Sequence, residues 1–202
     1  MQYEKGKLLN QMIDSGVLHS SHVIRAFKKV QRENFVRKEY VKNAYEDIPL
    51  PIAQGATISQ PSTIASMIEA LDAKKNQKIL EVGAGSGYQA ALLSEIIGEK
   101  GKVFTLEIEK DIYDFAKNNL KDCHNVTVIL SDGQKGYEKE SQYDRIIVAA
   151  AAKDMPLALL EQLKISGIMV IPIGTEMFRI TKVLEKEAIK EFIGNYAFVP
   201  LR

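Results

Sequence analysis

The sequence predicts an α/β protein: a Rossmann-like, mostly parallel sheet with antiparallel C-terminal strands, preceded by a helical N-terminal region. Three observations predict this class. From about residue 77 onward, apolar runs of strand length alternate with amphipathic helical segments, which is typical of a parallel sheet covered on both faces. One such run leads directly into a glycine-rich turn and then a helix. The first fifty residues instead carry apolar side chains at helical spacing.

The composition is that of one ordinary globular domain. The chain has 202 residues, of which 46% are hydrophobic and 26% charged, which argues against disorder. A single cysteine, Cys123, excludes an internal disulfide and a thiolate metal cage. The formal net charge of +1 provides no basic excess for nucleic acid, and there is neither a membrane-length apolar run nor a secretory signal. We therefore expect a cytoplasmic protein with no nucleic-acid, membrane or metal partner.

Three helical segments are expected before residue 50. Apolar residues recur at helical spacing in 8–13, and Gly16 follows at a position where glycine often ends a helix. Ser20 or Ser21 is expected to cap a second helix, because serine hydroxyls accept hydrogen bonds from the free N–H groups of a first turn. A third, short helix is expected over residues 39–44.

Prolines occur in the segment between these helices and the expected sheet. Pro49 and Pro51 interrupt the helical pattern, so residues 52–60 are expected to form an irregular loop. Pro61 suits the first position of the next helix, where its missing N–H is not needed. We expect residues 1–60 to form N-terminal helices and a covering loop, and residues 61–202 to form the ligand-binding core, within one structural domain.

The remaining elements alternate. The expected parallel strands are Lys78–Val82, Lys102–Leu106, Val126–Leu130, Arg145–Ala149 and Ile168–Ile173. The expected helices between them are Tyr88–Ile97, Asp111–Leu120 and Pro156–Leu163. No strong helical signal follows residue 173, and segments 178–185 and 188–198 are expected to be two antiparallel strands.

The most informative segment follows the first of these strands. It is a turn with three glycines, formed by Gly83, Ala84, Gly85, Ser86 and Gly87. Dinucleotide-binding turns read G-x-G-x-x-G, and here the third glycine comes one residue early. Glu81 stands two residues before the first glycine, where a carboxylate suits the ammonium group of an amino-acid moiety and repels phosphate. The turn therefore favours S-adenosylmethionine over NAD.

Acidic residues follow the next two strands. Glu107 ends the second strand, where a carboxylate is placed to hydrogen-bond the ribose hydroxyls of an adenosine. Asp132 and Gly133 follow the third strand, where they can meet the adenine edge. Each residue alone also fits a strand end or a turn. Together, at successive strand ends, they predict a nucleoside lying across the C-terminal edge of the sheet. Asp144, which opens the fourth strand away from that edge, is expected to be structural.

Several motifs together resemble protein-L-isoaspartate O-methyltransferases. They are the glycine turn, Ala56-Thr57-Ile58-Ser59-Gln60-Pro61, Arg32-Glu33-Asn34-Phe35-Val36, Ala44-Tyr45-Glu46-Asp47 and Phe198-Val199-Pro200-Leu201. The resemblance runs from about residue 5 to residue 202. It implies a class I methyltransferase fold with altered strand order near its C-terminal end. It also implies that S-adenosylmethionine donates a methyl group to the α-carboxylate of L-isoaspartyl residues in damaged proteins, leaving S-adenosylhomocysteine.

The resemblance also assigns roles to residues. Ser59 is the residue that the family treats as catalytic, and Ala56, Thr57 and Ile58 with Ser59 would close over donor and acceptor. Glu107, Asp132 and Gly133 match cofactor-binding positions. Judged by spacing alone, Thr57 and Ser59 also fit turn and capping positions.

The chemistry needs little from the chain beyond alignment. A carboxyl of this type has a pKa of about 3.3–3.7, so it is an anion at pH 7 and needs no general base. We expect the Ser59 hydroxyl to hydrogen-bond this carboxylate and aim one oxygen at the methyl group. The expected partners are isoaspartyl-containing proteins and peptides, bound by a monomer.

Three alternatives stay open. One is a methyltransferase of the same fold that acts on a small molecule, RNA or DNA; the Asn/Asp-Pro-Pro-aromatic run typical of base methylation is replaced here by four alanines, 149–152. Another is a non-catalytic binding protein, against which Ser59 and the full glycine turn argue. The third is an NAD-dependent oxidoreductase, which the glycine spacing and the lack of a Tyr-x-x-x-Lys pair disfavour.

Overall fold

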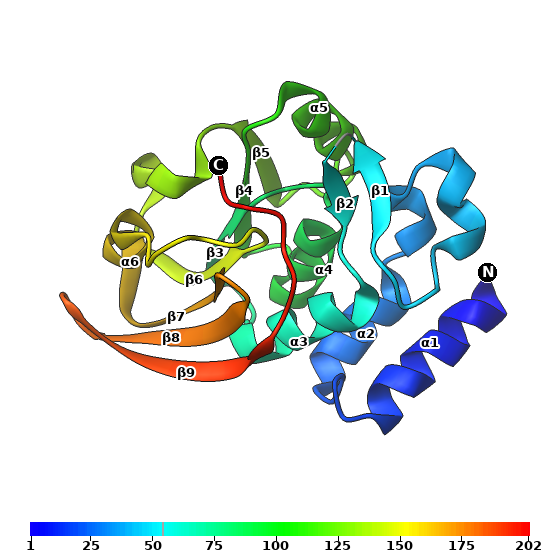
Figure 1. Ribbon diagram of the computed structural model, residues 1–202, viewed down its shortest axis with the longest axis horizontal. Helices are drawn as coiled ribbons and strands as arrows, with labels where there is room; N and C mark the ends of the chain where they lie inside the picture. The colour runs from blue at the N-terminus through cyan, green and yellow to red at the C-terminus, as the bar shows by residue number, and fades with distance from the viewer. Residues whose placement is uncertain (54) are drawn as a thin grey trace.

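The computed structural model describes residues 1–53 and 55–202, and its centre is a seven-stranded sheet. The strands stand in the order β5-β4-β3-β6-β7-β8-β9 (Figure 1). Their bounds are β3 Lys78–Val82, β4 Lys102–Glu107, β5 Val126–Leu130, β6 Tyr143–Val148, β7 Leu163–Ile173, β8 Glu176–Leu184 and β9 Glu187–Asn195. The first five are parallel, and β8 and β9 each run antiparallel to the preceding strand. This confirms the predicted mixed sheet.

Strand order decides where a ligand can bind. β3 lies between β4 and β6. The chain continues from β3 to β4 and β5 on one side and later returns to β6 on the other side, so the strand order reverses at β3. In open α/β sheets, ligands bind at such a switch point, beyond the carboxyl ends of the strands. The last three strands instead follow one another in chain order, as a meander that carries the chain away from this point (Figure 1).

Helices cover both faces of the sheet, unequally. The α-helices are α1 Gln2–Asp14, α2 Ser21–Lys29, α3 Pro61–Leu71, α4 Tyr88–Ile97, α5 Lys110–Asn119 and α6 Leu157–Gln162. The short 3-10 helices are η1 Arg32–Phe35, η2 Lys38–Asn43, η3 Gly133–Lys135 and η4 Glu138–Glu140. In one apolar core, the helices from α1 through α5 pack together with one face of the sheet. A second core, beneath α6, covers the other face. The short helix expected over 39–44 is thus a 3-10 helix.

The N-terminal region is built into the larger core. The rings of Phe27 in α2 and Phe35 in η1 pack against the ring of Tyr88, with centroids 6.3 and 5.5 Å apart. The guanidinium of Arg32 lies 5.2 Å from the centre of the same ring. Because Tyr88 begins α4 directly after the glycine turn, these contacts brace that turn from behind.

The expected irregular loop over 52–60 is wrong. Residues Leu50–Ala53 and Ala56–Ile58 form β1 and β2, which pair antiparallel as a small separate hairpin (Figure 1). Pro51 is tolerated there because its exposed position, opposite Thr57, lies in a two-stranded ribbon with free edges. Because side chains alternate along the strands, Leu50, Ile52 and Ile58 are buried, and Ile52 lies beside Gly85 of the glycine turn.

Two carboxylates complete the start of helices. Ser20 is the N-cap of α2, but its side chain makes no capping hydrogen bond; instead, Glu69 of α3 accepts hydrogen bonds from the backbone N–H groups of His19 and Ser20, just before the helix. Asp47 accepts hydrogen bonds from the N–H of Ser62 and the side chain of Gln60, at the start of α3. Among the described residues, no helix is long and apolar enough to cross a membrane.

Candidate active site

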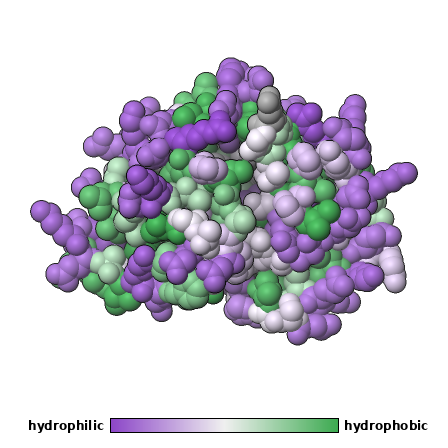
Figure 2. Space-filling model, in the orientation of Figure 1, coloured by the Kyte–Doolittle hydropathy of each residue, from purple (hydrophilic) through white to green (hydrophobic). Residues whose placement is uncertain are grey.

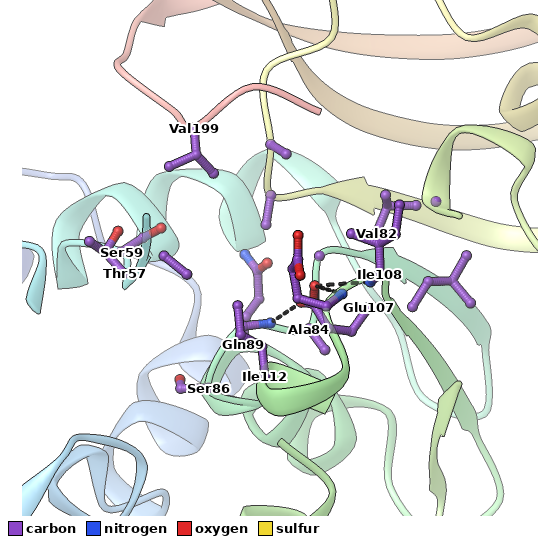
Figure 3. Close-up of a pocket in the computed structure, with 18 of the residues that line it drawn as sticks. Thr57, Ser59, Val82, Ala84, Ser86, Gln89, Glu107, Ile108, Ile112 and Val199 are labelled. Carbon is purple, nitrogen blue, oxygen red and sulfur yellow. Dashed lines mark hydrogen bonds between the residues drawn. The ribbon is translucent and has the colours of Figure 1, made fainter. Parts of the chain in front are cut away.

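A cavity of about 1040 Å³, its open mouth included, lies beyond the carboxyl ends of β3, β4 and β6 (Figure 3). It is at the switch point of the sheet. Segments far apart in the sequence line it, with most residues coming from four of them: residues 55–59 of the hairpin and its exit, residues 82–89 from the end of β3 into α4 (Gly87 excepted), residues 106–109 at the end of β4, and residues 199–202 near the C-terminus.

The floor of the cavity is the glycine turn. Gly83, Gly85 and Gly87 have φ of 92°, 53° and 84°, a region that residues with a Cβ rarely adopt. Gly83 and Gly85 line the cavity, whereas a Cβ on Gly87 would stand 2.8 Å from the Leu120 side chain. The first two glycines therefore keep the backbone open to a ligand, and the third allows close packing of α4 on the chain after α5.

Glu107 is held at the edge of the cavity by backbone donors. One carboxylate oxygen accepts the Gly85 N–H at 3.1 Å, and the other accepts those of Ile108 and Glu109 at 2.9 and 3.1 Å. Only 8% of the residue is exposed, and it lines the cavity (Figure 3). Charge-assisted hydrogen bonds of this kind fix a carboxylate well, so Glu107 offers an oriented acceptor for ligand hydroxyls.

Ser59 lies on the other side of the cavity, between β2 and α3. Figure 3 shows Thr57 and Ser59 across the cavity from Glu107. Ser59 is half-buried, and the next residues are held by Asp47 through the bonds to Gln60 and Ser62. The sequence motif thus places its hydroxyl at the wall of the same cavity as the glycine turn.

The C-terminal segment crosses the mouth of the cavity. Leu201 donates its N–H to the carbonyl of Ala151, whose own N–H is donated to the carbonyl of Val199. Arg202 then forms an ion pair with Glu109 at 2.9 Å. Figure 1 shows this segment, in red, running back over the carboxyl ends of the central strands.

The residues at the cavity fit an adenosyl amino acid. Glu107 suits a ribose, and Leu106, Ile108 and Ile112 add apolar wall for an adenine ring. A Cβ on Gly133 would stand 2.3 Å from Val82 Cγ1, so only glycine allows the chain after β5 to pass this close to the end of β3. No phosphate-binding lysine or arginine lies in the glycine turn.

Of the thirteen predicted site residues, ten line this cavity: Ala56, Thr57, Ile58, Ser59, Gly83, Ala84, Gly85, Ser86, Glu107 and Gly133. The other three do not. Gly87 caps α4 and packs against Leu120. Asp132 turns its carboxylate to the N–H of Gln134 and to Lys135, 3.4 Å away, although its neighbours Ser131 and Gly133 do line the cavity.

The expectation that Glu81 points into the glycine turn is wrong. Its side chain is fully buried behind the turn, where Thr105 Oγ1 donates a 2.5 Å hydrogen bond to Oε2. Its Oε1 has no partner among the described residues. Burial raises the pKa of Glu81 to about 8, against the smaller effect of the Thr105 hydrogen bond. The reason is the strand period: Glu81 stands opposite Thr105 in the β3–β4 register, so both side chains point to the same side of the sheet.

The structure adds residues that the sequence did not single out. Gln89 of α4 and Ile112 of α5 line the cavity, as do Ile108 and Val199 (Figure 3). Helical spacing marks Ile112 only as a core residue, and nothing in the sequence marks Gln89. The C-terminal motif was quoted for its resemblance, but its crossing of the cavity depends on the isolated bridge between Ala151 and Pro200.

Comparison with known proteins gives consistent results. The family model described as protein-L-isoaspartate(D-aspartate) O-methyltransferase matches residues 3–202. A protein-L-isoaspartate O-methyltransferase of Ignicoccus hospitalis is 45% identical, over 100% of this chain and 98% of its own. One of Methanopyrus kandleri is 44% identical, over 96% of this chain and 89% of its own.

Solved structures are also similar. A structure named protein-L-isoaspartate O-methyltransferase superposes with a TM-score of 0.89 at 32% identity, over 97% of this chain and 65% of that one. A Plasmodium falciparum structure, described under the same enzyme name in complex with S-adenosyl-L-homocysteine, has a TM-score of 0.85 at 26% identity, over 97% of both chains. Because the family model and the relatives span nearly its whole length, this chain belongs to the protein-L-isoaspartate(D-aspartate) O-methyltransferase family.

Proposed function

We propose that this chain transfers the methyl group of S-adenosylmethionine to the α-carboxylate of L-isoaspartyl residues in damaged proteins, as a repair enzyme. The observation that carries the proposal is the placement of Ser59 and Glu107 on two sides of one cavity floored by the glycine turn. Membership of the family supports the reaction. The acceptors are proteins and peptides, and the product left by the donor is S-adenosylhomocysteine.

On the donor side, Glu107 accepts hydrogen bonds from the ribose hydroxyls, while Ile108 and Ile112 pack against the adenine ring. Gly83, Ala84, Gly85 and Ser86 leave the backbone open beneath the amino-acid moiety, and Ala56 to Ser59 close over it. When bound, the donor supplies an electrophilic methyl group. Gly133 lies beside the base, together with Ser131.

On the acceptor side, Ser59 positions an anion. The isoaspartyl α-carboxylate is ionised at pH 7, so the chain need not remove a proton. The Ser59 hydroxyl donates a hydrogen bond to one carboxylate oxygen and directs the other toward the donor. Alignment of two reactants can supply up to about 7–11 kcal/mol of barrier reduction, which makes orientation the main contribution of the chain.

The surface around the cavity suits a polypeptide acceptor. Figure 2 shows polar and charged side chains around the periphery of this face, and apolar side chains nearer its centre. Val199, which is 43% exposed, lies at the mouth. We infer that residues 1–60 help to cover the site formed by the core of residues 61–202, within one domain. We further infer a cytoplasmic monomer, which size-exclusion chromatography with light scattering would test for oligomeric state.

One assay tests the proposal directly. The protein is incubated with methyl-labelled S-adenosylmethionine and a pair of peptides that differ only in an isoaspartyl or an aspartyl residue. We expect label on the isoaspartyl peptide alone, released by mild base as a methyl ester is. No label on either peptide, or equal label on both, would contradict the proposal. Labelling of small molecules or RNA instead would support the alternative methyltransferases of the same fold.

A further inference from the structure

Gln89 is a buried polar residue that neither the sequence motifs nor the proposed donor contacts explain. It lies in the first turn of α4, lines the cavity and is 7% exposed. Among the described residues, its carboxamide has one hydrogen-bond contact, from Nε2 to the Met67 sulfur at 3.8 Å. Figure 3 shows this carboxamide between the side of the cavity that carries Ser59 and the side that carries Glu107.

This pairing leaves most of the amide unused. A glutamine carboxamide has two N–H donors and a carbonyl acceptor, and a thioether sulfur is a weak acceptor. The carbonyl oxygen of Gln89 has no hydrogen-bond partner among the described residues and is not fully buried, so it is open to the cavity that the residue lines. The chain also contains an ordinary buried glutamine for comparison: Gln162 is equally 7% exposed, but accepts the Tyr137 N–H and donates to the Lys135 carbonyl, each at 2.8 Å. The spare hydrogen-bonding capacity of Gln89 therefore points to a ligand in the cavity.

The charges around the cavity indicate which ligand group it meets. Three charged side chains line the described wall: Glu107, Glu109 and Arg202, and the last two pair with each other at 2.9 Å. An acceptor carboxylate entering beside Ser59 thus finds no free cation there among the described residues. A carboxylate has two oxygens to satisfy, and the Ser59 hydroxyl supplies one donor. The N-terminal end of α4, from which Gln89 projects, favours an anion.

We propose that a side-chain N–H of Gln89 donates a hydrogen bond to the α-carboxylate of the isoaspartyl acceptor, as the second neutral donor beside Ser59. This inference rests on the proposed function, because it names a contact for the same acceptor. Two donors from different elements, the β2–α3 connection and α4, fix the plane of the carboxylate as well as its position. Gln89 is then a determinant of specificity for a carboxylate over a neutral amide acceptor.

Two substitutions test the contact. Gln89→Met keeps the length of the side chain and its packing on Met67 but removes the amide, and Gln89→Glu keeps the shape but places an anion beside the acceptor. We expect the Met variant to lower kcat/KM for an isoaspartyl peptide about 10- to 100-fold, chiefly through KM, which corresponds to the loss of one hydrogen bond to a charged group. The Glu variant should lower it further. Calorimetric Kd for S-adenosylhomocysteine should change less than about 2-fold in both.

A control separates binding from structure. Gln162→Met removes the matched buried amide outside the cavity, and it should lower Tm without changing KM for the peptide. Unchanged kcat/KM in Gln89→Met would overturn the inference, as would a fall shared equally by Gln162→Met. Tighter binding of S-adenosylhomocysteine by Gln89→Glu would overturn it in favour of a contact with the donor's ammonium group. Wild-type protein inactive on isoaspartyl peptide, yet binding S-adenosylhomocysteine, would overturn the proposed function itself.

Discussion

The carboxylate of Glu107 accepts a hydrogen bond from the backbone N–H of Gly85 at 3.1 Å, and this bond ties the end of β4 to the turn that follows β3. Glu107 ends β4 and Gly85 follows β3, its parallel neighbour, so their contact forms only when these two strands pair. It connects the floor of the cavity to one of its walls.

Replacing Glu107 should weaken donor binding more than it unfolds the chain. Glu107→Gln removes the charge that three backbone donors share, and that the ribose hydroxyls share in the proposed complex. We expect the calorimetric Kd for S-adenosylhomocysteine to rise about 10- to 100-fold, the usual effect of losing a hydrogen bond to a charged group. Glu109→Gln is the matched control, because its exposed pairing with Arg202 is worth little, and it should change Kd less than about 3-fold. Equal effects of the two variants would contradict the assigned role of Glu107.

Asp47 should matter to turnover although it lies outside the cavity lining. Its carboxylate holds the N–H of Ser62 and the amide of Gln60, directly after Ser59. Asp47→Ala should lower the free energy of unfolding by about 0.5–2 kcal/mol, as the loss of a capping residue does. It should also lower kcat with little change in Kd for S-adenosylhomocysteine. Glu46→Ala removes a neighbouring carboxylate whose one side-chain hydrogen bond among the described residues is to Asn43, and it should leave kcat unchanged; if both variants behave alike, Asp47 has no positioning role.

The buried Glu81 should make stability depend on pH. Burial raises its pKa to about 8 in the folded chain, from an ordinary value of 4.5. The folded state therefore holds a proton that the unfolded state has released, so this contribution is present below pH 4.5 and is lost as the pH rises to about 8. Denaturant unfolding of wild type and Glu81→Gln should show the Gln variant gaining relative stability as the pH rises from 5 to 8. A constant difference across that range would show that Glu81 is ionised throughout.

Much of the fold could be predicted because the signals are local. Continuous apolar strands and amphipathic helices set the sheet, and Pro61 begins α3 as its missing N–H allows. The hairpin was missed because Pro49 and Pro51 indicate a break, whereas the pairing that stabilises it joins Leu50 to Ile58 and depends on burial beside the glycine turn. The hydrogen bonds from Glu69 to the segment just before α2 could not be recognised, since Glu69 is some fifty residues away in the sequence.

The location of the site could be predicted from the sequence, but the direction in which each nearby side chain points could not. Glycine spacing and the acidic residue that ends β4 located the cavity, because both lie at the carboxyl ends of strands. Whether a side chain at a strand end faces the cavity or the core depends on its position in the strand and on its neighbours. Glu81 meets Thr105 behind the turn, and Asp132 bends back to its own 3-10 helix. Gln89 was recognised only from its weak hydrogen bond to the Met67 sulfur, a contact that no sequence pattern indicates.

In the proposed mechanism, the hydroxyl of Ser59 orients the acceptor and contributes little to the affinity for the donor. The most direct measurement is single-turnover methylation of an isoaspartyl peptide by wild type, Ser59→Thr and Ser59→Ala, with Kd for S-adenosylhomocysteine determined in parallel. We expect Ser59→Ala to slow transfer about 100-fold, as the loss of one preorganised donor does, with Kd within about 2-fold of wild type. Ser59→Thr should retain a substantial part of the rate. Transfer by Ser59→Ala at the wild-type rate would contradict the account.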